Sequence, residues 1–329
     1  MRKGIVNNSL FTPVEKEIAL VEKTIKHTSQ VEYPWLNELL DYVVDSGGKR
    51  IRPALTLLCG KFHNYDLNLL IPMAAGVELL HTATLVHDDT IDKSEKRRGR
   101  PTASNVWGSG IAILVGDYVF AQSAELVART GNLRVIRLFA GTLMALCTGE
   151  LSQNLHSYNP DQTRHNYFKR IEQKTASLFS TATESAGILS QAPEKDIQAL
   201  RSYGHNLGIA FQITDDILDF IADEEKLGKP VGSDLIQGTM TLPSILLKEW
   251  YPDDNPINDI FKNNGNKGDN LRSLELAVDM IMNSEIITEC YHIANTFVSN
   301  AHQAIRHFPD NECKRSLLEI ADHAVARQL

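Results

Sequence analysis

The sequence has few of the features that mark secreted, zinc-binding or membrane proteins. Its four cysteines, Cys59, Cys147, Cys290 and Cys313, form no C-x-x-C pair, which argues against both a zinc site and a disulfide framework. No apolar run has the length of a signal-peptide core or approaches an uninterrupted bilayer span. We therefore expect a cytoplasmic protein that does not cross a membrane.

Positive charge is also scarce. The 329 residues carry a formal net charge of −8, so a broad electrostatic attraction to nucleic acid is not expected. An anionic ligand would need metal ions or a local cluster of basic residues. With 43% hydrophobic and 22% charged residues, the chain has the composition of a globular protein and is long enough to bury a large core.

Apolar residues recur mostly at helical spacing, and strand-like alternation is rare, which predicts an all-α fold. Thr12 is expected to cap a first helix that begins at Pro13. Nothing in the composition divides the chain, so residues 1–329 are predicted to form a single domain. The segment 250–270 is predicted to be an exposed excursion. Longer helical runs are expected at 72–92, 111–128, 132–155, 163–190 and 194–222.

The pattern D-D-x-x-D occurs twice, each time after a mainly apolar run. On a helix, its first and last acids lie one turn apart on one face. Paired carboxylates suit a hard cation such as magnesium, whose coordination is usually completed by phosphate oxygens of a substrate. Acids at a helix C-terminus oppose the helix dipole unless a cation offsets them. The two copies consist of Asp88, Asp89 and Asp92 and of Asp215, Asp216 and Asp219.

A single acidic run is about as often a solvated helix end as a site, and the repetition favours the site. A calcium loop would need a glycine-turned loop that ends in a bidentate glutamate, and neither copy has one. A glycosidase-like pair of catalytic acids would use only one acid from each copy.

Cations stand beside glycine or in short runs at four places: "GGKRIRP", "EKRRGR", "EQKTASLF" and "KLGKPVGSDL". Such sequences suit phosphate, because the backbone can approach closely while the side chains neutralise charge. Each run alone is more often solvated surface. Together with two acidic clusters they indicate a diphosphate ligand, or two. The basic residues are Lys49, Arg50, Arg52, Arg97, Arg98, Lys174 and Lys229.

These motifs occur in a recognisable order. With "HTATLVHDDTID", "RRGRPT", "KTASLF", "FQITDDILDF" and "GKPVGSDL", the span from Gly47 to about Pro243 resembles the trans-isoprenyl diphosphate synthases of the polyprenyl synthetase family. The resemblance implies the isoprenoid synthase fold, an all-α helical bundle around a deep central cavity, and a homodimer. It also implies head-to-tail condensation of isopentenyl diphosphate with an allylic diphosphate, with release of inorganic diphosphate.

The resemblance further implies roles for the matching residues. All six aspartates would hold magnesium, with three ions per active site. Catalysis would rest on Asp88, Asp92, Arg97, Lys174 and Lys229. Isopentenyl diphosphate would be bound by Lys49, Arg52, His81 and Arg98. The allylic diphosphate would be bound by Arg97, Lys174, Thr175, Gln212 and Lys229. A lone histidine on a buried helix is more often a core residue than a ligand contact, but His81 lies two turns before Asp88 on the same face.

The length of the product is expected to depend on the helix before Asp88. One turn rises about 5.4 Å, roughly one isoprene unit. In short-chain members an aromatic residue blocks the turn where this chain has Ala83 and Thr84, so these residues would form the chain-length floor and leave the cavity open. Deeper turns present Gly76, which has no side chain to block with. The products would be of geranylgeranyl length or longer. Simple helix packing is the alternative for both residues.

Three other classes of protein remain to be separated. A terpene cyclase also ionises a diphosphate but has no use for a second cluster formed by Lys49, Arg52 and Arg98. A non-catalytic subunit of a heteromeric synthase would be expected to have lost acids from one cluster, and both are complete. A purely structural helical protein would leave the paired clusters unexplained.

Overall fold

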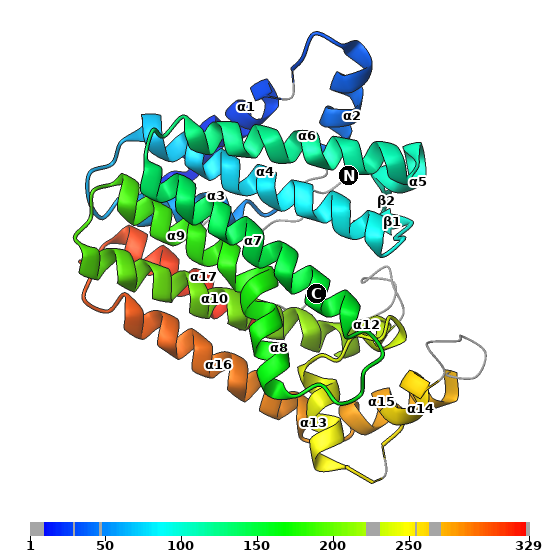
Figure 1. Cartoon of the computed structure of the whole chain (residues 1–329). Helices are drawn as coiled ribbons and strands as arrows, with labels where there is room; N and C mark the ends of the chain where they lie inside the picture. The colour runs from blue at the N-terminus through cyan, green and yellow to red at the C-terminus, as the bar shows by residue number, and fades with distance from the viewer. Residues whose placement is uncertain are drawn as a thin grey trace. The chain divides into compact units, whose positions relative to one another are not determined.

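The described part of the chain is almost entirely helical, as the periodicity predicts (Figure 1). The only strands among the described residues are β1 (Lys96–Arg97) and β2 (Arg100–Pro101), which pair as an antiparallel hairpin. This computed structural model describes residues 10–28, 30–45, 48–221, 231–253, 255–262 and 271–326.

Contacts between Cα atoms divide the chain into two compact units. Unit 1 comprises Met1–Gly141, Leu178–Gly204 and Ala304–Ile320, and unit 2 comprises Thr142–Ser177, His205–Gln303 and Ala321–Leu329. The single domain expected over residues 1–329 stays a prediction.

Each unit has helices of its own, and some helices run through a boundary. Unit 1 holds a 3₁₀ turn η1 (Thr12–Val14), α1 (Glu15–Thr28), α2 (Pro34–Val44), α3 (Ile51–Gly60), α4 (Leu67–Ile91), α5 (Ala103–Trp107) and α6 (Ser109–Ala128). Unit 2 holds α8 (Arg164–Ile171), a π-helical turn η2 (Glu172–Ala176), α12 (Ser233–Ile236), α13 (Leu242–Trp250), α14 (Ile257–Lys262) and α15 (Leu271–Met282). The boundaries fall within α7 (Leu133–Leu155), α9 (Ser177–Leu189), α10 (Glu194–Ile221), α16 (Ile286–Ala304) and α17 (Glu312–Ala326).

Helix α4 is the centre of unit 1 and runs beside α6 (Figure 1). It begins at Leu67, because the Asp66 side chain accepts the Asn68 N–H at 2.9 Å and caps it. The predicted start at Pro72 was therefore wrong: Pro72 lies inside the helix, where it removes only one backbone hydrogen bond.

Two close approaches fix α4 against α6. A Cβ added at Gly76 would lie 2.8 Å from Cγ2 of Val127, and one added at Gly116 would lie 2.3 Å from Nε2 of His87. Glycine is thus needed at position 76, where the backbone of α6 is also close, whereas at position 116 a side chain would displace the His87 ring. The expectation that Gly76 leaves a tunnel open was wrong, because that position is filled by α6.

Ala83 lies on this same face of α4. It is seven positions after Gly76 and four before His87, and its side chain is only 2% exposed. Thr84 is part-buried, and its hydroxyl donates to the carbonyl of His81 at 2.8 Å. The chain-length role of Ala83 and Thr84 stays a prediction, with Ala83 turned toward α6.

Two local predictions about the chain were also wrong. Phe11, not Thr12, occupies the N-cap before η1, and no side chain caps that turn. The segment 250–270 is not wholly exposed, because α14 buries Ile257, Ile260 and Phe261. These three residues have helical i, i+3, i+4 spacing and form one apolar face. Residues 254 and 263–270 lie outside the described part.

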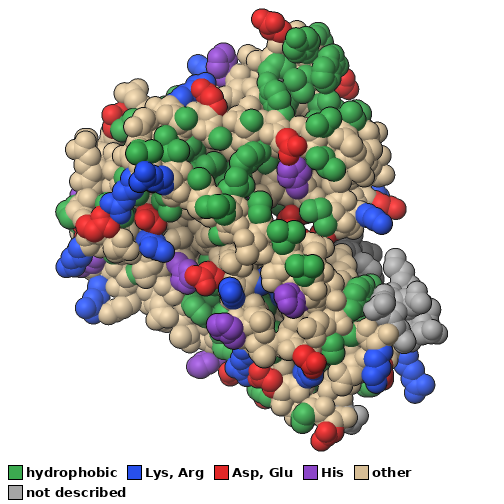
Figure 2. Space-filling model, viewed as in Figure 1, with side chains coloured by type: hydrophobic (Ala, Val, Ile, Leu, Met, Phe, Trp, Pro, Cys, Tyr) green, Lys and Arg blue, Asp and Glu red, His purple; other side chains and the backbone are tan. Residues whose placement is uncertain are grey.

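Three described helices, α4, α6 and α7, are long and apolar enough to cross a membrane by length and composition alone, so the expectation that no apolar run approaches a bilayer span was wrong. That the protein does not cross a membrane stays a prediction. In α4, 61% of the apolar window is buried inside the protein, against 39% in α6 and 28% in α7. Hydrophobic side chains gather on the face seen in Figure 2. On α6 and α7 the exposed ones include Ile111, Leu114, Met144, Leu151 and Leu155. A partner that covers these faces is expected on physical grounds.

Candidate functional site

The C-terminal end of α4 places the first acidic cluster as predicted. Asp92 caps the helix, and its N–H donates to the carbonyl of Asp88 at 2.8 Å, so the two residues stand one turn apart. Asp92 is exposed and Asp88 is partly exposed. Their carboxylates can therefore be reached by a ligand from outside the helix.

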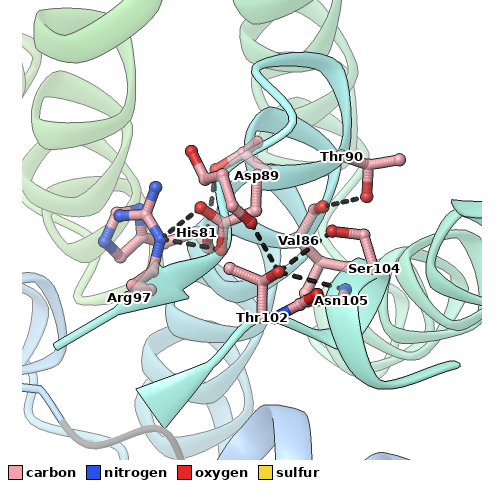
Figure 3. Close-up of polar contacts among 10 residues, drawn as sticks. His81, Val86, Asp89, Thr90, Arg97, Thr102, Ser104 and Asn105 are labelled. Atoms are coloured by element: carbon pink, nitrogen blue, oxygen red, sulfur yellow. Dashed lines mark hydrogen bonds and ion pairs between the residues drawn. The ribbon is translucent and has the colours of Figure 1, made fainter. Parts of the chain in front are cut away.

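Asp89, the middle acid, is only 6% exposed. Both of its carboxylate oxygens accept from Nε of Arg97 at 2.8 Å (Figure 3). Burial raises the pKa of the Asp89 carboxyl, and the charge of Arg97 counteracts this rise. Asp89 thus serves as the anchor of Arg97 in this structure.

The hairpin β1–β2 presents the two adjacent arginines. Arg98 and Gly99 both have positive φ angles, 52° and 77°, as a tight two-residue hairpin turn requires. The base of the hairpin is held by Thr102, whose hydroxyl donates to the carbonyl of Ser94 at 2.6 Å and accepts from the N–H of Asn105 (Figure 3). The glycine-flanked sequence "RRGR" is therefore a turn that displays cations.

His81 lies among arginines, next to Arg97 in Figure 3. Burial is the main cause that lowers the pKa of His81 well below its ordinary value, and the neighbouring guanidinium charges lower it further. The imidazole is therefore neutral at physiological pH and can donate one N–H and accept at the other nitrogen. The contributing arginines are Arg50, Arg52, Arg97 and Arg98.

A buried acid, Glu78, balances part of this positive charge. Nη1 of Arg50 lies 2.8 Å from Oε1 of Glu78, and Nε of Arg50 lies 3.6 Å from Glu22. Glu78 also acts electrostatically on Arg98. Arg50, which the sequence grouped with the phosphate-binding cations, is thus held by acids of the protein. Arg52 lies with its guanidinium 4.5 Å from the ring centre of Phe179, and Lys49 is exposed.

In unit 2, the middle acid of the second cluster is also internal. Asp216 is 4% exposed; its Oδ2 accepts from the Tyr167 hydroxyl at 2.7 Å and its Oδ1 from Nε2 of Gln212 at 2.8 Å. Burial and the nearby charge of Asp234 raise the pKa of Asp216 to about 7. The Thr175 hydroxyl donates to Oε1 of Gln212 at 2.6 Å, which brings two predicted substrate-binding residues together.

Asp219, the last acid of the second cluster, holds the start of α12. Its side chain is 2% exposed and accepts from the Ser233 hydroxyl at 2.7 Å and from the Asp234 N–H at 3.2 Å. The motif "VGSDL" is therefore tied to the acidic cluster through Asp219. Asp215, in contrast, is partly exposed.

Lys174 and Thr175 stand on the π-helical turn η2, a feature frequent at functional sites. Nζ of Lys174 lies 2.5 Å from Oε2 of Glu150 on α7. The two segments approach closely at Gly149, where an added Cβ would lie 3.1 Å from the backbone nitrogen of Lys174. Lys229, the remaining predicted cation, lies outside the described residues.

The carboxylates fit a divalent cation by their chemistry, since hard oxygen donors are what magnesium binds. Within the described ranges, no group of three or more His, Cys, Asp or Glu side chains is placed to hold a metal by itself. This fits a metal whose coordination is completed by phosphate oxygens.

Sequence reasoning missed two buried groups, Glu78 and Tyr167, and the π-helical turn. Glu78 precedes His81 by three positions on a mainly apolar helix, and a buried acid among cations at that spacing is the signal that could have found it. Tyr167 stands seven residues before Lys174 and has no motif of its own.

The chain is similar to proteins of one family. The model of a family described as polyprenyl synthetase matches residues 33–277. Heptaprenyl diphosphate synthase component 2 of Geobacillus stearothermophilus is 36% identical over 313 residues, which cover 95% of this chain and 96% of that protein.

Two solved structures are also similar. A heptaprenyl diphosphate synthase from Staphylococcus aureus superposes with a TM-score of 0.89 at 35% identity, covering 95% of this chain and 98% of that one. A polyprenyl synthase from Caulobacter crescentus CB15, complexed with calcium and isoprenyl diphosphate, gives a TM-score of 0.91 at 31% identity, covering 100% of both chains.

Proposed function

The chain belongs to the polyprenyl synthetase family and is a prenyltransferase, and from this premise we propose that it condenses isopentenyl diphosphate head-to-tail with an allylic diphosphate. The products are all-trans polyprenyl diphosphates, and inorganic diphosphate is released. The observation that carries the proposal is the arginine-rich surrounding of neutral His81 on the same helix as the accessible acid pair at Asp88 and Asp92.

The acids divide into two groups by their contacts. Asp88, Asp92 and Asp215 are at least partly exposed, and we assign them to magnesium. Asp89, Asp216 and Asp219 are buried, and both carboxylate oxygens of each accept hydrogen bonds from the protein. When bound, magnesium supplies positive charge that stabilises the departing diphosphate. The calcium in the Caulobacter crescentus structure supports a divalent cation in such a site.

The protein's own residues bind and orient both substrates. Lys49, Arg52, His81 and Arg98 belong to the isopentenyl diphosphate subsite, and the neutral imidazole contributes a hydrogen bond without adding charge. Arg97, Lys174 and Lys229 provide fixed positive charge where the allylic carbon–oxygen bond breaks. Because the Thr175 hydroxyl donates to Gln212, its proton is not available to the diphosphate oxygens, which only accept; its oxygen lone pairs can instead stabilise the developing allylic cation.

The chain makes products of medium or long length. Two similar proteins are named heptaprenyl diphosphate synthases, which supports a length beyond geranylgeranyl. The helix turn before Asp88 has threonine and alanine, with no aromatic side chain. Thr84 lies closer than Ala83 to the face of α4 that carries His81 and Asp88, so Thr84 is the better candidate for the floor.

The exposed apolar side chains of α6 and α7 support a homodimer. A second copy of this chain would cover them, as a cytoplasmic protein requires. A heteromeric synthase is the second candidate, because the Geobacillus stearothermophilus relative is named as a component 2. Light scattering of the purified chain, without detergent, separates a dimer from a monomer that needs another protein or lipid.

The test is incubation of the purified chain with magnesium, labelled isopentenyl diphosphate and each allylic starter, followed by chain-length analysis. We expect elongated products that depend on isopentenyl diphosphate and disappear with Asp88→Asn. Products formed from an allylic diphosphate alone would instead indicate a terpene cyclase. If the dimeric chain gives no product with any starter, the chain is better explained as one subunit of a heteromeric synthase.

A further inference from the structure

We infer that Tyr167 is a positioning residue for the allylic half of the reaction, an inference that rests on the function proposed above. Tyr167 lies in α8 with 0% of its side chain exposed, and its hydroxyl donates to Oδ2 of Asp216 at 2.7 Å. Its hydroxyl bonds to Asp216, and it acts through that carboxylate on Gln212 and Thr175, which are assigned to the allylic substrate.

The hydrogen bonds form a chain of fixed direction. Tyr167 donates to one oxygen of Asp216, and the other oxygen accepts from Nε2 of Gln212. The amide of Gln212 therefore turns its oxygen to Thr175, whose hydroxyl donates to it at 2.6 Å. At one end of the chain of hydrogen bonds, Tyr167 fixes the orientation of the Asp216 carboxylate, and at the other end Thr175 contacts the allylic substrate.

The carboxylate would lose this orientation without the tyrosine hydroxyl. Asp216 is 4% exposed, so water does not readily replace a missing donor at Oδ2. A positive charge that acts on Asp216 is that of Arg170, itself 7% exposed and bonded to Gln162. A carboxylate that turns toward Arg170 leaves Nε2 of Gln212 without its acceptor, and Thr175 then loses its fixed position.

A purely structural role makes a different prediction, and the chain offers a matched control. Tyr203 also has a fully buried side chain, and its hydroxyl donates to the carbonyl of Leu317 at 2.7 Å. Replacing either tyrosine by phenylalanine removes one buried hydrogen bond and no carbon atom. Tyr203 lies in unit 1, and its acceptor is a backbone carbonyl of α17.

The experiment measures steady-state kinetics of Tyr167→Phe and Tyr203→Phe with each substrate varied in turn. For Tyr167→Phe we expect kcat/KM for the allylic diphosphate to fall about tenfold or more, as for a lost hydrogen bond to a charged group. We expect KM for isopentenyl diphosphate and every parameter of Tyr203→Phe to stay unchanged. Equal behaviour of the two variants would overturn the inference.

A double-mutant cycle with Gln212→Ala tests whether Tyr167 acts on the allylic substrate through Gln212. If Tyr167 acts through Gln212, adding Tyr167→Phe to Gln212→Ala should cost less than twofold, and additive losses would overturn the inference. Calorimetric binding of an allylic thiolodiphosphate with magnesium gives a readout without turnover, and Tyr167→Phe should weaken it about tenfold. If the wild-type chain makes no product with any starter, the proposed function itself has failed.

Discussion

Glu78 allows a quantitative test of the charge balance in unit 1. Its side chain is 7% exposed, that of Arg50 is 17% exposed, and their closest atoms are 2.8 Å apart. Glu78→Gln keeps the size and one acceptor oxygen but removes the negative charge that faces Arg50 and acts on Arg98. Loss of one partner of a buried ion pair costs about 3 to 5 kcal/mol. Because Arg50 keeps Glu22 and glutamine can still accept a hydrogen bond, we expect a loss of about 2 kcal/mol.

Urea unfolding of the wild-type and variant proteins, followed by circular dichroism, measures this loss. Glu125→Gln is the control, because Glu125 pairs with Arg129 on the exposed surface of α6, where 55% and 52% of the two side chains are exposed. That variant should lose about 0.5 kcal/mol or less. If Glu78→Gln loses no more stability than Glu125→Gln, then Glu78 does not balance the charge of the arginines around His81, and the electrostatic description of that cluster is wrong.

Four further outcomes are expected. Asp88→Ala should slow condensation at saturating magnesium by a factor of about 100 or more, and a loss under about tenfold in a steady-state assay would refute its assignment. Thr84→Phe should shorten the products, and unchanged lengths on chromatography would reject it as the floor. Ala83→Tyr should lower Tm, because overpacking against α6 costs about 1 to 3 kcal/mol; calorimetry without a change would refute that packing. In the folded protein the pKa of Asp216 is raised to about 7 from an ordinary 3.8. The protonated Asp216 carboxyl therefore stabilises the fold fully below pH 3.8, and this stabilisation is lost as the pH rises through about 7. The free energy of unfolding of the metal-free wild type, relative to Asp216→Asn, should therefore fall between about pH 4 and about pH 7, and a constant difference in urea titrations would contradict this.

The sequence predicted the helices and the placement of the first acid pair because both depend on local spacing. Asp88 and Asp92 are four positions apart, and any helix through them puts them on one side. The start of α4 was misjudged because Pro72 is a strong local signal, whereas the capping bond of Asp66 lies upstream of it. Local rules thus gave the element and missed its boundary.

The contacts that organise the acidic and basic clusters within each unit could not be predicted in the same way. The pair of Arg50 with Glu78 joins residues 28 positions apart, and the bond of Tyr167 to Asp216 joins residues 49 positions apart. No periodicity within a helix encodes such pairs, because they depend on how helices pack. The sequence consequently grouped Arg50 with the neighbouring cations without finding its acidic partner, and it did not single out Tyr167.

The repeated acidic motif shows that identical residues at identical spacing can differ in their contacts. Six identical carboxylates stand at identical spacing, yet the fold uses the middle acid of each copy in another way. Asp89 accepts twice from Arg97, and Asp216 accepts from Tyr167 and Gln212. Each is bonded to a residue assigned to the allylic substrate, so each arranges the cation or amide that binds it. In each copy the middle acid is buried and orients its neighbours, and in the second copy the last acid, Asp219, is buried as well, which leaves Asp88 and Asp92 in the first copy and Asp215 in the second at least partly exposed.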